Sequence, residues 1–191
     1  MNSKNQIIAG VSIYNLNYLI EFHNYVRGLL KDEFQNLKKL DIKDREKNIY
    51  REKLKNYDRN LHINTFLMMY SYLEECLYIY WKEYAPKVKL EIKKGSIGRF
   101  KNIVKQLGVD LSSNCWQVIM EAEEIRNCLL HANGRISLLK DSKKVKNIIK
   151  KDSGLTISRD RVVIYGEYLQ KLNENIANLI NTLNSQVQAP V

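Results

Sequence analysis

The segment from His62 to Tyr84 predicts a long helix at the centre of the fold. Large apolar side chains recur in it every three or four residues, so a helix would gather them on one broad face. These residues are Phe66, Met69, Tyr70, Leu73, Leu77, Tyr80 and Trp81. A face this wide must be buried against other elements, and we therefore expect this segment to be the central core helix.

Helical spacing also predicts the elements at the two ends of the chain. Apolar residues from about Ile13 to Leu37 indicate a long first helix, and those from Tyr165 to Leu183 indicate a final amphipathic helix. Between the first and the core helix, residues 41–60 alternate in charge and have few apolar side chains. We expect this stretch to be an exposed helix, or part of one, that projects beyond the core.

The remaining segments predict short elements. Arg99 to Gln106 reads as a short helix, which Gly108 can terminate. A lysine-rich loop is expected after Lys140. The sequences LTIS and RVVI then flank Arg159 and Asp160, a pattern that predicts a small hairpin before the last helix.

Length and composition favour one globular domain over residues 1–191. Of the 191 residues, 45% are hydrophobic and 27% are charged, which is typical of a soluble protein. No apolar run is long enough to span a bilayer, and the first residues lack the pattern of a secretory signal, so we expect a cytoplasmic protein without a membrane partner. Cys76, Cys115 and Cys128 are widely spaced and should be buried free thiols.

The net charge of +10 is concentrated in two segments. Lys82 to Lys105 contains eight basic and two acidic residues, and Lys140 to Arg161 contains eight basic and three acidic residues. Clustered lysines suit a nucleic acid backbone, because binding there is driven by neutralising phosphates and releasing counterions. The alternative is a solvated surface that keeps the protein in solution.

The stretch EEIRNCLLHANG, from Glu123 to Gly134, lies near the end of a predicted helix. Asn114 is a good N-cap, and Gln117 three residues later would complete a capping box. At the other end, Asn133 and Gly134 can adopt the left-handed conformation that closes a helix. His131 is therefore expected in the last turn.

The helical wheel separates the polar residues of this stretch from its apolar face. The face that the helix should bury consists of Val118, Ala122, Ile125 and Leu129. Glu124, Asn127 and His131 form a second stripe roughly opposite, and Arg126 lies about 140° around the helix from His131. One copy of the helix does not bring Arg126 and His131 together. The simpler alternative is that the helix dipole favours His131 at this position and that Arg126 is a solvated side chain.

Several common kinds of site have no support in the sequence. His23, His62 and His131 occupy separate segments, and none has a second histidine or cysteine at metal-ligand spacing. No Gly-x-Ser-x-Gly nucleophile elbow and no glycine-rich phosphate loop are found. We therefore expect neither a metal nor a cofactor.

Arg126 and Asn127, followed by three residues and His131, resemble the Arg-x(4–6)-His signature of HEPN domains. The surroundings are also similar: YSYLEECL at the core helix, GSIGRFKNIVKQLGV before the motif helix, Trp116 at the start of that helix, and HANGRI from the histidine onward. The resemblance covers the chain from about Ile13 to Leu183.

The resemblance implies an all-α, up-and-down helical bundle of HEPN type, here with the small β-hairpin before the last helix. It further implies a homodimer with the active site at the interface, and a metal-independent endoribonuclease that serves as a toxin or anti-phage defence effector. An antitoxin or another regulatory partner is compatible with this reading. The alternative is a catalytically silent HEPN module that binds RNA or a protein. One branch of the family has a modified tyrosine two residues after the histidine, where this chain has Asn133.

The resemblance also suggests a role for each residue of the motif. His131 would act as general base or acid, and Arg126 would stabilise the phosphate. Asn127 would orient His131 or contact the phosphate. Glu124 would help to hold these residues in position without contacting the phosphate itself. Basic residues on the two charged segments would bind the RNA backbone without reading its sequence. The candidates are Lys93, Lys94, Arg99, Lys101, Lys143 and Lys144.

Overall fold

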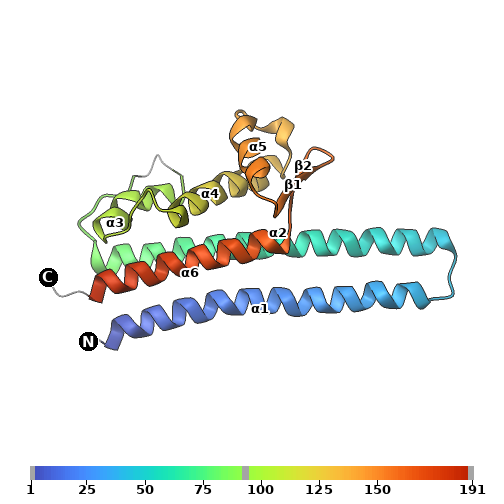
Figure 1. Ribbon diagram of the computed structural model, residues 1–191, viewed down its shortest axis with the longest axis horizontal. Helices are drawn as coiled ribbons and strands as arrows, with labels where there is room; N and C mark the ends of the chain where they lie inside the picture. Colours follow the sequence, from blue (N-terminus) through green and yellow to red (C-terminus); the bar gives the residue numbers. More distant parts are fainter. Residues whose placement is uncertain (1–2, 92–94, 189–191) are drawn as a thin grey trace.

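The computed structural model describes residues 3–91 and 95–188, and its helices alternate in direction to form an up-and-down bundle (Figure 1). Within these residues lie four long α-helices, two short ones and one β-hairpin. The long helices are α1 (Ser3–Lys39), α2 (Asp44–Tyr84), α4 (Asn114–Ala132) and α6 (Gly166–Gln188). The short elements are η2 (Gly98–Phe100), α3 (Lys101–Gln106), η3 (Ile136–Leu138), α5 (Ser142–Lys151), β1 (Leu155–Ser158) and β2 (Arg161–Ile164). The predicted all-α bundle with a hairpin before the last helix is confirmed.

Helices α1 and α2 form a long antiparallel pair, and α6 packs against α1, α2 and α4 (Figure 1). Residues 44–60, the charged stretch, are the first part of α2, which continues without a break to Tyr84. Figure 1 shows that this end of the α1–α2 pair extends beyond the other elements. No helix in residues 3–91 or 95–188 combines the length and apolar character needed to cross a membrane.

The second half of α2 is the core helix that the sequence predicts. Phe66, Met69, Tyr70 and Leu73 are almost completely buried there. They pack with apolar side chains of the neighbouring helices, which include Leu16, Ile119, Ile125, Leu172 and Ile176. Trp81 differs from the prediction, because it is only partly buried and its indole Nε1 donates to the carbonyl oxygen of Val88 at 2.9 Å.

The lysine-rich segment after Lys140 is helical, and the prediction of a loop there is wrong. Helix α5 begins after Asp141, whose side chain accepts a hydrogen bond from the Lys143 amide at 3.2 Å. Val145 and Ile148 are buried one turn apart and hold the helix against the rest of the fold. The short apolar stripe is not evident from the sequence, because the many lysines around it make the segment resemble a loop.

The hairpin of β1 and β2 fixes the end of the motif helix. Its turn residues Arg159 and Asp160 have φ values of 47° and 65°, as a two-residue type I′ turn requires. The segment after α4 pairs with it, since the Ile136 amide donates to the carbonyl oxygen of Asp160 at 2.9 Å and Arg135 forms a bridge with Arg161. These contacts place Arg161 beside the C-terminus of α4.

Candidate functional site

Helix α4 carries the Arg126 to His131 motif, and its two ends are closed by specific caps. Its N-cap is Ser113, whose Oγ accepts from the Trp116 amide at 3.3 Å, so the predicted cap at Asn114 is wrong by one residue. Asn133 and Gly134 have φ values of 49° and 73°, which confirms the predicted left-handed end. The predicted apolar stripe of Val118, Ala122, Ile125 and Leu129 is buried, as expected.

Arg126 lies on the side of α4 that faces α2. Its guanidinium carbon is 5.7 Å from the centroid of the Tyr70 ring, within the range of a cation–π contact. Its Nη1 donates to Oδ1 of Asn127 at 3.1 Å. The hydrogen bond of Asn127 thus goes to Arg126, whereas the sequence suggested a contact with His131. Arg126 is half-buried and held from two directions.

His131 occupies the last turn of α4 and is exposed to solvent. In the described part of the chain it has no hydrogen-bond or ion-pair partner. Leu130, beside it in sequence and one turn beyond Arg126, is an exposed apolar side chain with 49% of its surface accessible. The structure therefore does not bring Arg126 and His131 into contact within one chain, in agreement with their separation on the wheel.

Glu124 and the predicted RNA-binding residues have separate environments. Glu124 Oε1 is 3.6 Å from Lys144 Nζ, an exposed ion pair between α4 and α5. Lys143 and Lys101 are exposed, and Arg99 forms a 2.7 Å ion pair with Glu74. Lys93 and Lys94 lie outside the described residues. Among the predicted site residues, the structure brings Glu124 close to Lys144 and Arg126 close to Asn127.

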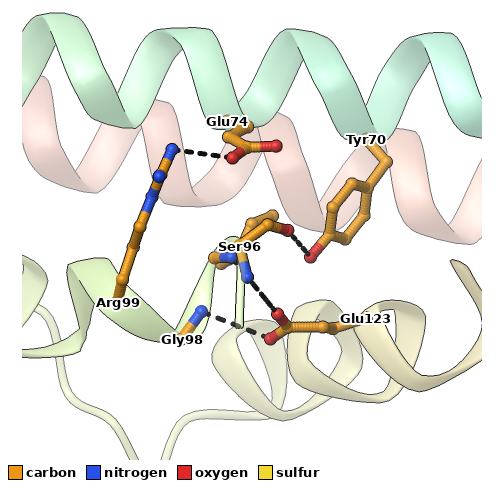
Figure 2. A network of polar contacts seen from close by, with 7 residues as sticks. Tyr70, Glu74, Ser96, Gly98, Arg99 and Glu123 are labelled. Carbon is orange, nitrogen blue, oxygen red and sulfur yellow. Dashed lines mark hydrogen bonds and ion pairs between the residues drawn. The ribbon is translucent and has the colours of Figure 1, made fainter. Parts of the chain in front are cut away.

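Glu123, which the sequence analysis did not select, is buried and binds the loop before η2 (Figure 2). Its Oε1 accepts from the amides of Ser96 at 2.7 Å and Ile97 at 3.3 Å, and its Oε2 accepts from the Gly98 amide at 3.2 Å. Ser96 Oγ in turn lies 2.9 Å from the Tyr70 hydroxyl. The carboxylate of Glu123 thus helps to hold the ring against which Arg126 packs.

The same loop requires a glycine next to Glu123. Gly95 has a φ of +86°, and a side-chain carbon at this position would lie 2.2 Å from the Glu123 carboxylate. The GSIG sequence is the only signal for this contact, and it does not identify the acidic partner. Burial raises the pKa of Tyr70 well above its ordinary value, which further favours the neutral hydroxyl.

A small cavity lies between α2, the end of α4 and β2, and we call it the arginine cavity. Its volume is about 140 Å³. It is lined by Arg59, Asn60, Ile63, Leu67, Leu129, Asn133 and Arg161. Arg161 Nη1 donates to the carbonyl oxygen of Asn133 at 2.9 Å. The Nε atom of Arg59 is buried and has no hydrogen-bond partner among the described residues.

The arginine cavity could not be found from the sequence. Arg59 belongs to the charged half of α2 and Arg161 to the hairpin, and no spacing rule connects them. Burial, and secondarily the positive charge of Arg161, lowers the pKa of Arg59 from its ordinary value. Only the fold shows that these two guanidinium groups are close enough to repel each other.

An apolar groove runs along α2 next to the arginine cavity. It has a volume of about 610 Å³ and is lined by Leu19, Asn64, Leu67, Met68, Ser71, Tyr72 and Glu75. Leu67 lines both the groove and the arginine cavity. The polar and apolar surfaces on this side of α2 are therefore continuous.

Comparison of the chain with protein-family models, with curated proteins and with solved structures found no significant match. Among residues 3–91 and 95–188, no three histidine, cysteine, aspartate or glutamate side chains are grouped as a metal site would need. Cys76, Cys115 and Cys128 are free thiols, and Cys76 and Cys128 are buried as the sequence predicts, whereas Cys115 is only partly buried. A functional assignment must therefore rest on the α4 residues and their surroundings.

Proposed function

We propose that the protein is a metal-independent endoribonuclease of HEPN type that acts as a homodimer. The observation that carries the proposal is the arrangement on α4, where Arg126 is held against Tyr70 and Asn127 while His131 is exposed in the last helical turn. A preorganised arginine and an accessible histidine are the two groups that phosphodiester cleavage needs. Together with the resemblance of the motif, this arrangement favours RNA as the substrate.

The proposed reaction uses the nucleophile that RNA itself supplies. His131 removes the proton from a ribose 2′-hydroxyl, and the oxygen attacks the adjacent phosphorus. The bond from phosphorus to the 5′-oxygen breaks, and that oxygen leaves as a hydroxyl after receiving the proton that His131 took up. The products are a 2′,3′-cyclic phosphate and a 5′-hydroxyl end. Arg126 stabilises the charge that develops on the phosphate oxygens.

A dimer would complete this site, because one chain keeps Arg126 and His131 on different faces of α4. Two α4 helices that meet around a two-fold axis can place the arginine of one chain opposite the histidine of the other. The exposed Leu130 between these residues gives such a contact an apolar element. The apolar groove along α2 adds further surface of the kind that protein interfaces cover.

A catalytically silent HEPN module is the second candidate. The observation that favours it is the absence, within the described residues, of any side chain that hydrogen-bonds to His131. Histidines that act as a general base are commonly oriented by a second group. In this case the basic surface of α5 and Arg126 would bind RNA or an acidic partner without cleaving it.

The experiment that separates the two candidates is cleavage of a mixed RNA pool in EDTA. Wild type would be compared with Arg126→Ala and His131→Ala, and with Arg45→Ala, which removes an exposed arginine far from α4. The proposal expects 2′,3′-cyclic phosphate ends from the wild type and the Arg45 variant only. Equal cleavage by His131→Ala would refute the catalytic assignment. Folded wild type that binds RNA without cleaving it would support the silent module.

The biological role that we propose for such an enzyme is that of a toxin or anti-phage effector. A nuclease of this kind needs a partner, such as an antitoxin, that keeps it inactive in a healthy cell. Expression of the wild type should then arrest growth in a bacterial host, whereas His131→Ala should not. Equal growth of both strains would refute this role.

A further inference from the structure

We propose that the arginine cavity binds a phosphate group of the RNA strand, separate from the phosphate that is cleaved at α4. The phosphate chemistry follows from the cavity itself, and the assignment to RNA rests on the proposed function. Arg59 from α2 and Arg161 from β2 line the same small space, and within residues 3–91 and 95–188 no acidic side chain lines it with them. Two partly exposed guanidinium groups with no carboxylate beside them create a positive potential that attracts an anion.

The unpartnered donor of Arg59 supports an anionic ligand. Its Nε atom is buried and has no hydrogen-bond acceptor in the described part of the chain, although buried donors are nearly always satisfied in folded proteins. Leaving such a donor unpaired costs free energy, and the nearby charge of Arg161 adds repulsion. A phosphate between the two side chains would supply the missing acceptor and remove the repulsion.

The size and the walls of the arginine cavity fit a phosphate group. Its volume of about 140 Å³ lies well below the ~300–1,000 Å³ of most small-molecule pockets, so it suits one compact group and not a whole nucleotide. Asn60 and Asn133 add neutral polar groups, and Ile63, Leu67 and Leu129 form an apolar wall. An apolar wall lowers the local dielectric constant and strengthens the attraction between the arginines and an anion.

The position of the arginine cavity relates it to the α4 site. Asn133, the C-cap of α4 and two residues beyond His131, lines the cavity and accepts a hydrogen bond from Arg161. An RNA strand with one phosphate at His131 would therefore pass the cavity as it leaves the end of α4. Binding a second phosphate there would fix the direction of the strand without reading its bases.

The test uses the full chain carrying His131→Ala, so that RNA binds without being cleaved. Arg59→Gln and Arg161→Gln would be added singly to this background, and Arg45→Gln would serve as the matched control on the exposed end of α2. The first readout is the Tm in inorganic phosphate against chloride at equal ionic strength. The second is the Kd for a short labelled single-stranded RNA, measured by fluorescence anisotropy over a range of salt concentrations.

The proposal expects phosphate to raise the Tm of the background and of the Arg45 variant, and to have no effect on the two cavity variants. Loss of either cavity arginine should weaken RNA binding roughly ten- to a hundredfold at low salt. The slope of log Kd against log salt should fall by about 0.7 for the phosphate contact that is lost. The Arg45 variant should match the background in both measurements.

Two results would overturn the proposal. Equal phosphate effects on the Tm of all variants would show that the cavity binds no phosphate. Phosphate protection that depends on Arg59, with RNA affinity and salt slope unchanged, would show that the ligand is not an RNA phosphate. Neither measurement involves turnover, so failure of the wild type to cleave RNA would refute the proposed function and leave the phosphate site standing.

Discussion

Replacing Glu123 with glutamine should destabilise the fold far more than the same change at the neighbouring Glu124. The Glu123 carboxylate accepts hydrogen bonds from three backbone amides, those of Ser96, Ile97 and Gly98, and only 5% of the residue is exposed. A glutamine keeps one acceptor oxygen and places an amide nitrogen, which only donates, where the second oxygen was. At least one buried backbone amide would then face another donor.

The magnitude follows from these contacts. Hydrogen bonds to a charged group contribute about 1.5–3 kcal/mol each, and an unsatisfied buried donor costs about 1–3 kcal/mol. Losing one such bond and weakening the others should lower the free energy of unfolding by about 2–4 kcal/mol. For a chain of this length, that corresponds to a fall in Tm of roughly 4–16 °C.

Glu124→Gln is the matched control, because it removes the same charge one residue further along α4. Within the part of the chain that the structure describes, Glu124 interacts only with Lys144, 3.6 Å away, and both side chains are exposed. Exposed ion pairs of this kind contribute about 0–1 kcal/mol. Urea denaturation of both variants and the wild type at pH 7 measures the difference. Equal stability of the two variants would refute the role assigned to Glu123.

Three further predictions concern the buried His23 and two residues of α4. Burial lowers the pKa of His23 below its ordinary value of 6.5, so the unfolded chain binds more protons below that pH and the free energy of unfolding should fall there. His23→Gln should flatten this loss, as urea denaturation from pH 5 to 8 would measure. A pH dependence parallel to that of the wild type would contradict the assignment. Leu130→Lys should weaken the proposed dimer at least tenfold by analytical ultracentrifugation, while Leu138→Lys, at a more exposed leucine, should leave it intact. Arg126→Lys keeps the charge but loses the planar guanidinium group that contacts Tyr70 and Asn127. RNA cleavage by this variant should therefore fall about 100-fold or more with an unchanged Tm. Cleavage at the wild-type rate would show that the guanidinium group is not needed.

The sequence predicts correctly those elements in which the spacing of apolar residues matches their burial in the fold. Phe66, Met69 and Leu73 have helical spacing and are buried as one face of α2, and the Asn133-Gly134 pair ends α4 as its chemistry predicts. Helix α5 is not predicted, because its two buried residues, Val145 and Ile148, lie among lysines that dominate its composition. Short helices of this kind form through packing, which a local pattern records poorly.

The candidate site divides in the same way. The motif residues Arg126 and His131 belong to one helix, so their spacing alone places them on different faces. The contact of Arg126 with Tyr70 and the meeting of Arg59 with Arg161 join segments far apart in the chain. Such pairs depend on how helices and the hairpin pack, and a single sequence contains no local signal for them.

Helix α2 is one unbroken element that links the projecting end of the fold to both candidate sites. At about 1.5 Å per residue its 41 residues extend roughly 60 Å, from the charged end that projects beyond the bundle to the ring of Tyr70 and beyond. Arg59 and Tyr70 therefore belong to one continuous helix, and a displacement of its far end can reach both of them. A molecule that bound the projecting end and rotated α2 about its axis would move the arginine cavity together with Tyr70, the ring against which Arg126 packs.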